Sequence, residues 1–177
     1  MKSKVIAISA ISAGFIAIVL TVGAYLEFAD IFCLIMSSVF VLLPLYFNSY
    51  AGSFLGFLAG GIIALLFSGF NFLSLIFPCY FVFFGCYPLV VWFMRNKMVK
   101  EKISFLIGLI WCIAFCYGAY FYYTLVMNFN LDNLPEFLGQ YILYFLPVIA
   151  TVFYAIYHRF IFVIKFWLDR YLQRIVK

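Results

Sequence analysis

Charge is scarce in this sequence. Only 10% of its 177 residues are Asp, Glu, Lys or Arg, whereas soluble domains carry about 25%. No charged residue occurs in 31–94 or in 103–131. A charge at the centre of a bilayer costs about 2.5–3.5 kcal/mol, so uncharged stretches of this length belong in hydrocarbon. Because the chain is also 69% hydrophobic, these stretches exclude a soluble globular domain and predict a membrane protein.

Alternating segments of about ten residues, which a transmembrane β-barrel requires, are also lacking. The apolar stretches are continuous instead, and they are long enough for α-helical spans of about 20 residues. We therefore expect an all-α, polytopic membrane protein.

The basic residues that are present gather in three clusters. They are Lys2 and Lys4; Arg95, Lys97, Lys100 and Lys102; and Arg159, Lys165, Arg170, Arg174 and Lys177. The positive-inside rule places all three clusters in the cytoplasm, so an even number of spans must separate each cluster from the next. The intervals 5–94 and 103–158 have room for four spans and two spans. We expect six transmembrane helices in a bacterial cell membrane, with both termini inside.

The apolar runs give the bounds of six expected helices. These are Lys4–Leu26, Ile31–Phe47, Ala51–Phe67, Phe72–Met94, Ile103–Met127 and Glu136–His158. The first run exceeds the 7–15 apolar residues of a signal peptide, so we expect it to be retained as a span. Pro78 is expected to kink the fourth helix and to free backbone carbonyls.

The tail that follows the six-helix domain of residues 1–160 has the pattern of an amphipathic helix. As a helix, residues 161–177 would carry Lys165, Arg170 and Arg174 on one half and Trp167 and Leu168 on the other. Such a basic amphipathic tail would continue the last span and suits an anionic membrane surface. A partner protein is the alternative ligand for the same face.

Small residues recur at four-residue spacing on two of the expected helices, and such spacing lets helices approach closely. They are Ser9, Ala13 and Ala17 on one face of the first helix, Ala10 and Gly14 on another, and Gly52, Gly56 and Gly60 on the third helix. On the first helix two interpretations stay open. One is packing within the bundle, and the other is docking on another membrane subunit.

Motifs for catalysis, metal binding and nucleotide binding are missing. The five cysteines form no C-x-x-C pair, and we interpret them as small apolar residues of the core. His158, the single histidine, is expected to be solvated at the cytoplasmic interface, without an acidic partner. The sequence contains no P-loop, nucleophile elbow or H-E-x-x-H motif. These absences argue against an enzyme, a resident cofactor and an ion-coupled carrier acting alone.

The expected outer loops carry acids and amides, with tyrosines beneath them on the fifth helix. A pocket with such a polar rim and aromatic floor suits a small amphipathic or aromatic ligand. The candidate substrate-binding residues are Glu27, Asp30, Asn71, Tyr117, Tyr120, Asn128, Asp132 and Gln140. The tyrosines are equally compatible with an interfacial aromatic belt.

In length, helix number and orientation the chain resembles the substrate-binding S components of energy-coupling factor (ECF) type ABC transporters. The first helix of that family carries Ala-x-x-x-Ala, which Ala13-Gly-Phe-Ile-Ala17 matches here. The resemblance implies that Ser9, Ala10, Ala13, Gly14 and Ala17 dock on a transmembrane coupling protein driven by two cytoplasmic ATPase subunits. It also implies capture of a vitamin-like or other small micronutrient near the outer face.

Two other classes of function remain open. A noncatalytic scaffold or accessory subunit of a cell-envelope assembly complex would bind partners but no small molecule. A small lipid-modifying enzyme would use the outer carboxylates. Membrane lipids are expected partners in every case, and nucleic acid is not.

Overall fold

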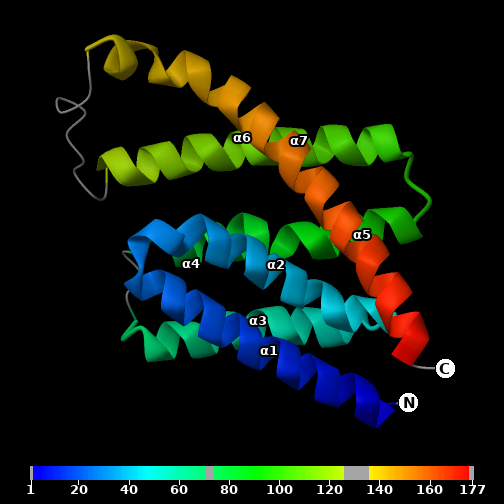
Figure 1. Cartoon of the computed structure of the whole chain (residues 1–177). Helices are drawn as coiled ribbons and strands as arrows, with labels where there is room; N and C mark the ends of the chain where they lie inside the picture. The colour runs from blue at the N-terminus through cyan, green and yellow to red at the C-terminus, as the bar shows by residue number, and fades with distance from the viewer. Residues whose placement is uncertain (1, 71–73, 126–135, 176–177) are drawn as a thin grey trace. The chain divides into compact units, whose positions relative to one another are not determined.

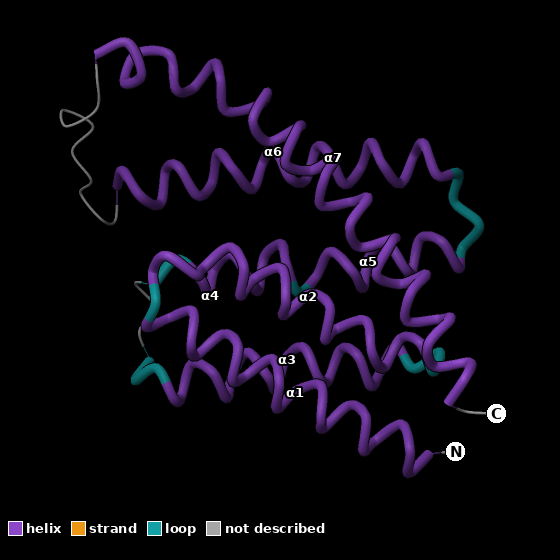
Figure 2. Tube along the Cα trace, viewed as in Figure 1, coloured by secondary structure: helices purple, strands orange, loops and turns teal. Residues whose placement is uncertain are grey.

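The computed structural model describes residues 2–70, 74–125 and 136–175, and within these ranges every regular element is helical (Figures 1 and 2). The all-α prediction is therefore confirmed for this part of the chain. The α-helices are α1 (Lys2–Tyr25), α2 (Asp30–Tyr46), α3 (Tyr50–Phe67), α4 (Ile76–Cys79), α5 (Cys86–Asn96), α6 (Glu101–Leu125) and α7 (Glu136–Ile175). A 3-10 turn, η1 (Glu27–Ala29), precedes α2, and a π-helical turn, η2 (Tyr80–Phe84), joins α4 to α5.

Within the described ranges, five helical segments are long and apolar enough to cross a membrane. They are Ser3–Tyr25, Tyr50–Phe67, Ile76–Asn96, Glu101–Tyr122 and Leu143–Leu168. Helix α2 is also apolar, but its 17 residues fall short of the usual span of about 20. The chain thus has the helices of a membrane protein, while the sixth span and the orientation stay predictions.

The helices form two compact units. One consists of Met1–Met98 together with Ile161–Lys177, and the other of Val99–Phe160. Helix α7 contributes to both, because it continues past His158 as an unbroken helix to Ile175.

In the first unit, the glycines of α3 lie against α1. A Cβ atom added to Gly60 would lie 2.7 Å from Cγ2 of Ile16 and 3.0 Å from the carbonyl oxygen of Ala13. One added to Gly56 would lie 3.3 Å from the carbonyl oxygen of Ser9. The predicted close helix crossing is confirmed, and its two sides are α3 and α1.

Among the described residues, three prolines lie in the interior of continuous helical segments: Pro44 in α2, Pro88 in the segment Ile76–Asn96 that α4, η2 and α5 form together, and Pro147 in α7. A proline has no N–H, so each one leaves the carbonyl four residues earlier without its helical donor. In each case a hydroxyl group of a different helix donates a hydrogen bond to that carbonyl.

Two of these bonds join helices of the first unit. The Ser12 hydroxyl of α1 donates to the Phe40 carbonyl of α2 at 2.5 Å, four residues before Pro44. The Ser38 hydroxyl of α2 donates to the Phe84 carbonyl at 2.8 Å, four residues before Pro88. The hydroxyls thus replace the missing N–H groups and link α1 to α2 and α2 to the η2 turn.

Pro78 does not interrupt a helix, so the predicted kink at this residue is wrong. Helix α4 begins at Ile76, not at Phe72, and Pro78 therefore stands in the first turn. First-turn N–H groups have no intrahelical acceptor, so a proline loses nothing there. The irregularity lies in η2, where the N–H of Gly85 donates to the Tyr80 carbonyl at 2.8 Å.

The second unit consists of α6 and the first part of α7, packed antiparallel. Gly108 lies so close to Tyr154 that an added Cβ would be 2.1 Å from the tyrosine oxygen. Further along, the Cys112 thiol donates to the Ala150 carbonyl at 3.8 Å. The Tyr117 hydroxyl donates at 3.1 Å to the Leu143 carbonyl, which Pro147 has freed.

The last part of α7 packs on α5 in the first unit. The ammonium group of Lys165 lies 3.3 Å from the centre of the Trp92 ring, and the Arg95 guanidinium lies 5.5 Å from the centre of the Phe162 ring. The sequence predicted that Lys165 would face an anionic membrane surface. Its ammonium group instead makes a cation–π contact within the protein.

Candidate binding surfaces

Only part of the predicted substrate site can be compared with the structure. Asn71, Asn128 and Asp132 lie outside the described residues, and so do the side chains of Glu27 and Gln140. The three others are Asp30 at the start of α2, in the first unit, and Tyr117 and Tyr120 on α6, in the second. Neither unit by itself assembles the predicted site, which stays a prediction.

Two of these three residues have structural roles. Asp30 occupies the first turn of α2, where a carboxylate interacts favourably with the positive end of the helix dipole. The Tyr117 hydroxyl satisfies the Leu143 carbonyl. Tyr117 is therefore part of the contact between α6 and α7. This role differs from both predicted ones, which were lining a substrate pocket and lying in an interfacial aromatic belt.

The two small-residue faces of α1 have different surroundings. Ala13 and Ala17 are 6% and 5% exposed, and the backbone on this side, at Ser9 and Ala13, meets the glycines of α3. Docking of a second subunit through Ser9, Ala13 and Ala17 does not fit this packing. Ala10 and Gly14, the two other predicted docking residues, are exposed, so this face stays available to a second subunit.

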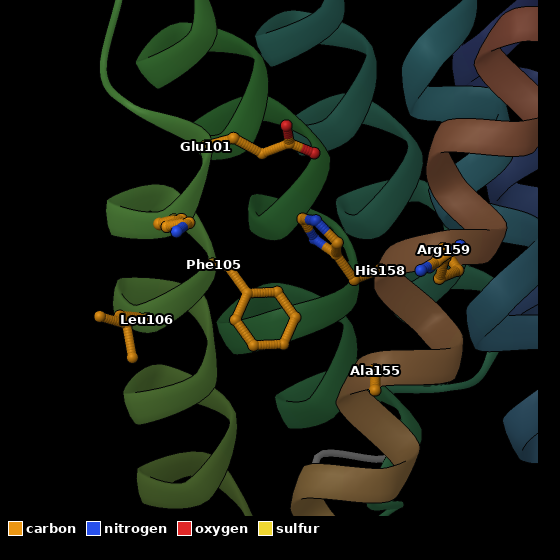
Figure 3. A pocket seen from close by; sticks show the side chains of 7 residues that line it. Glu101, Phe105, Leu106, Ala155, His158 and Arg159 are labelled. Carbon is orange, nitrogen blue, oxygen red and sulfur yellow. The ribbon is translucent and has the colours of Figure 1, made fainter.

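A pocket of about 630 Å³ opens in the second unit between the start of α6 and the middle of α7. Its lining combines four polar or charged side chains with three apolar ones: Glu101, Lys102, His158 and Arg159, and Phe105, Leu106 and Ala155. Figure 3 shows the side chains of Glu101 and His158 extending toward one another, with the Phe105 ring beside them.

His158 is buried, with 8% of its surface exposed. The Phe105 and Tyr154 rings pack on it, with centroids 5.3 Å and 5.6 Å from its own. The Glu101 side chain extends toward it (Figure 3). The expectation of a solvated histidine is wrong, because the ring is buried between aromatic side chains.

A sequence signal for this cluster does exist, although it is weak. Glu101 and Phe105 are four residues apart, as are Tyr154 and His158, so each pair shares a helix face. Nothing in the sequence says that these two faces meet, since that depends on the antiparallel register of α6 and α7.

Among the described residues, no group of three or more His, Cys, Asp or Glu side chains could hold a metal ion. The burial of the cysteines supports their interpretation as core residues, because Cys33, Cys79 and Cys112 are buried and Cys86 and Cys116 are half-buried.

Comparison of the chain with protein-family models, with curated proteins and with solved structures found no match in any of the three.

Proposed function

We propose that this chain is the noncatalytic, substrate-binding membrane subunit of an energy-coupling factor type importer in a bacterial cell membrane. It would cross the membrane six times with both termini inside. It would capture a vitamin-like small molecule at the outer face. A transmembrane coupling protein and two ATPase subunits would then drive uptake.

The observation that carries the proposal is the uncovered face of α1 at Ala10 and Gly14. A Cβ atom added to Gly14 would meet nothing within 4 Å, and Ile11 and Ile18 beside it are 56% and 61% exposed. In lipid, helices associate by close packing at small residues, because burial of apolar surface provides no driving force there. The face is therefore suited to a helix of another membrane protein.

The need for such a partner follows from the chemistry that the sequence lacks. The chain has no phosphate-binding loop. The one carboxylate in its expected spans is Glu136, at the first residue of the last span, and none lies deeper where it could couple transport to an ion gradient. An importer built on this chain requires an energy source from other subunits.

The proposal is tested by affinity purification of the tagged full chain from its native host in mild detergent, followed by mass spectrometry. The wild-type protein should bring a membrane coupling protein and two ATPases with it. Gly14→Leu should lose all three, because the leucine prevents close approach of the partner helix. Gly118→Leu on α6 is the matched control, since a Cβ there also meets nothing within 4 Å, and it should retain them.

Retention of the partners by the Gly14→Leu variant would contradict docking through this face. Recovery of cell-envelope enzymes without any ATPase would support the scaffold function instead. Small molecules extracted from the same sample would identify the substrate.

A further inference from the structure

We propose that the pocket between α6 and α7 binds the phosphate headgroup of an anionic phospholipid, with the adjoining part of the lipid lying on its apolar floor. This inference does not depend on the proposed transport function. It rests on the charge, the shape and the surroundings of the pocket.

The charge of the lining favours an anion. Lys102 and Arg159 carry two positive charges, against one negative charge on Glu101, and His158 is the remaining titratable group. Helix α6 begins at Glu101, so the positive end of its dipole also lies at the pocket. A phosphate between Lys102 and Arg159 would be bound by charge-assisted hydrogen bonds.

The floor of the pocket favours an amphiphile over a free phosphate. Phe105, Leu106 and Ala155 give the pocket apolar walls, and its volume of about 630 Å³ is within the range of about 300–1,000 Å³ for sites that bind small molecules. An inorganic phosphate would fill only the charged rim. The glycerol and first acyl carbons of a phospholipid would cover the apolar part as well.

The surroundings of the pocket are apolar and accessible. On α6, Ile103, Leu106 and Ile107 are 47%, 55% and 41% exposed, so a lipid chain leaving the pocket would continue along an apolar helix face. Basic pockets between membrane helices on the cytoplasmic side are known to hold anionic headgroups, and anionic lipids are enriched in that leaflet. The predicted orientation places Lys102 and Arg159 on this side.

The charge requirement can be measured by native mass spectrometry of the purified full chain. The protein is supplied with equal amounts of phosphatidylglycerol and phosphatidylcholine that carry the same acyl chains. The wild-type protein should retain phosphatidylglycerol preferentially. Lys102→Gln and Arg159→Gln should each weaken its retention by about fivefold, whereas Glu101→Gln should strengthen it. Lys4→Gln, which removes an equal charge that does not line the pocket, should have no effect.

The shape requirement calls for a second pair of variants. Ala155→Phe would fill the pocket without changing its charge and should abolish the preference for phosphatidylglycerol. Val152→Phe adds the same ring to an exposed position of α7 that does not line the pocket, and it should leave the preference intact.

Three results would overturn the proposal. The first is equal retention of the two lipids by the wild-type protein. The second is an effect of Lys4→Gln as large as that of Arg159→Gln, which would indicate a general surface attraction. The third is displacement of the lipid by millimolar inorganic phosphate or glycerol phosphate, which would make a soluble phosphate compound the ligand.

Discussion

Single hydroxyl groups link the proline-containing helices of this protein to their neighbours. Ser12, Ser38 and Tyr117 each donate to the carbonyl that a proline four residues later has freed. A bare carbonyl in a membrane core has no water to bind, so a donor at this position contributes more than an ordinary surface hydroxyl. Each proline is therefore tolerated inside its helix because a hydroxyl of a neighbouring helix replaces the missing N–H donor.

Ser38→Ala should lower the free energy of unfolding by about 1–2 kcal/mol, because it removes a bond between helices and leaves the Phe84 carbonyl without this donor. Ser37→Ala is the matched control. Both serines are fully buried on α2, but Ser37 donates only within its own helix, to the Leu34 carbonyl at 2.7 Å. Its loss should change stability by less than about 0.5 kcal/mol. Denaturation with SDS in mixed micelles, followed by tryptophan fluorescence, measures both.

A double-mutant cycle with Pro88→Ala tests the explanation itself. The alanine restores an N–H group that can donate to the Phe84 carbonyl, so Ser38→Ala should cost markedly less in that background. An equal cost in both backgrounds would show that Ser38 stabilises the protein for another reason.

At the scale of the helix pair, α6 and α7 depend on a close approach at Gly108. Its added Cβ would meet the hydroxyl of Tyr154, and Tyr154 cannot move aside easily because it is fully buried beside Phe105. Gly108→Ala should therefore destabilise the protein by about 1–3 kcal/mol. Gly118→Ala on the same helix meets no atom and should stabilise it by about 0.5–1 kcal/mol. Similar effects of both substitutions in the SDS titration would contradict the close packing of Gly108 on Tyr154.

The helices themselves could be predicted from the sequence, since long uncharged runs fix where helices lie and turn residues fix where they end. The expected bounds Ile31–Phe47 and Ala51–Phe67 differ from α2 and α3 by one residue. The uncharged runs do not reveal which helices pack against one another. The faces of Ala13 and Ala10 look alike in the sequence, and only packing shows that α3 covers the first. The pocket at His158 could not be predicted for the same reason, because it depends on how two distant helices pair.

At the scale of the whole molecule, the number of spans depends on α2. With 17 residues and an internal proline, α2 is shorter than the usual transmembrane helix of about 20 residues, whereas the five other predicted spans are long enough. The positive-inside rule requires it to cross, since otherwise the N-terminal and central basic clusters would lie on opposite sides of the membrane. The topology of the entire chain therefore depends on this short helix.

Single cysteines introduced into a cysteine-free variant can decide the matter through labelling with a membrane-impermeant maleimide in intact cells. Phe28→Cys, at a residue 89% exposed between α1 and α2, should be labelled from outside. Asn48→Cys, between α2 and α3, and Lys97→Cys, after α5, should be labelled only after the membrane is permeabilised. If α2 does not cross, α3 must enter from the outer side, so the cysteines at positions 48 and 97 would both become accessible in intact cells. That paired result would also place the Lys102 and Arg159 pocket at the outer surface, away from the leaflet where anionic lipids are enriched.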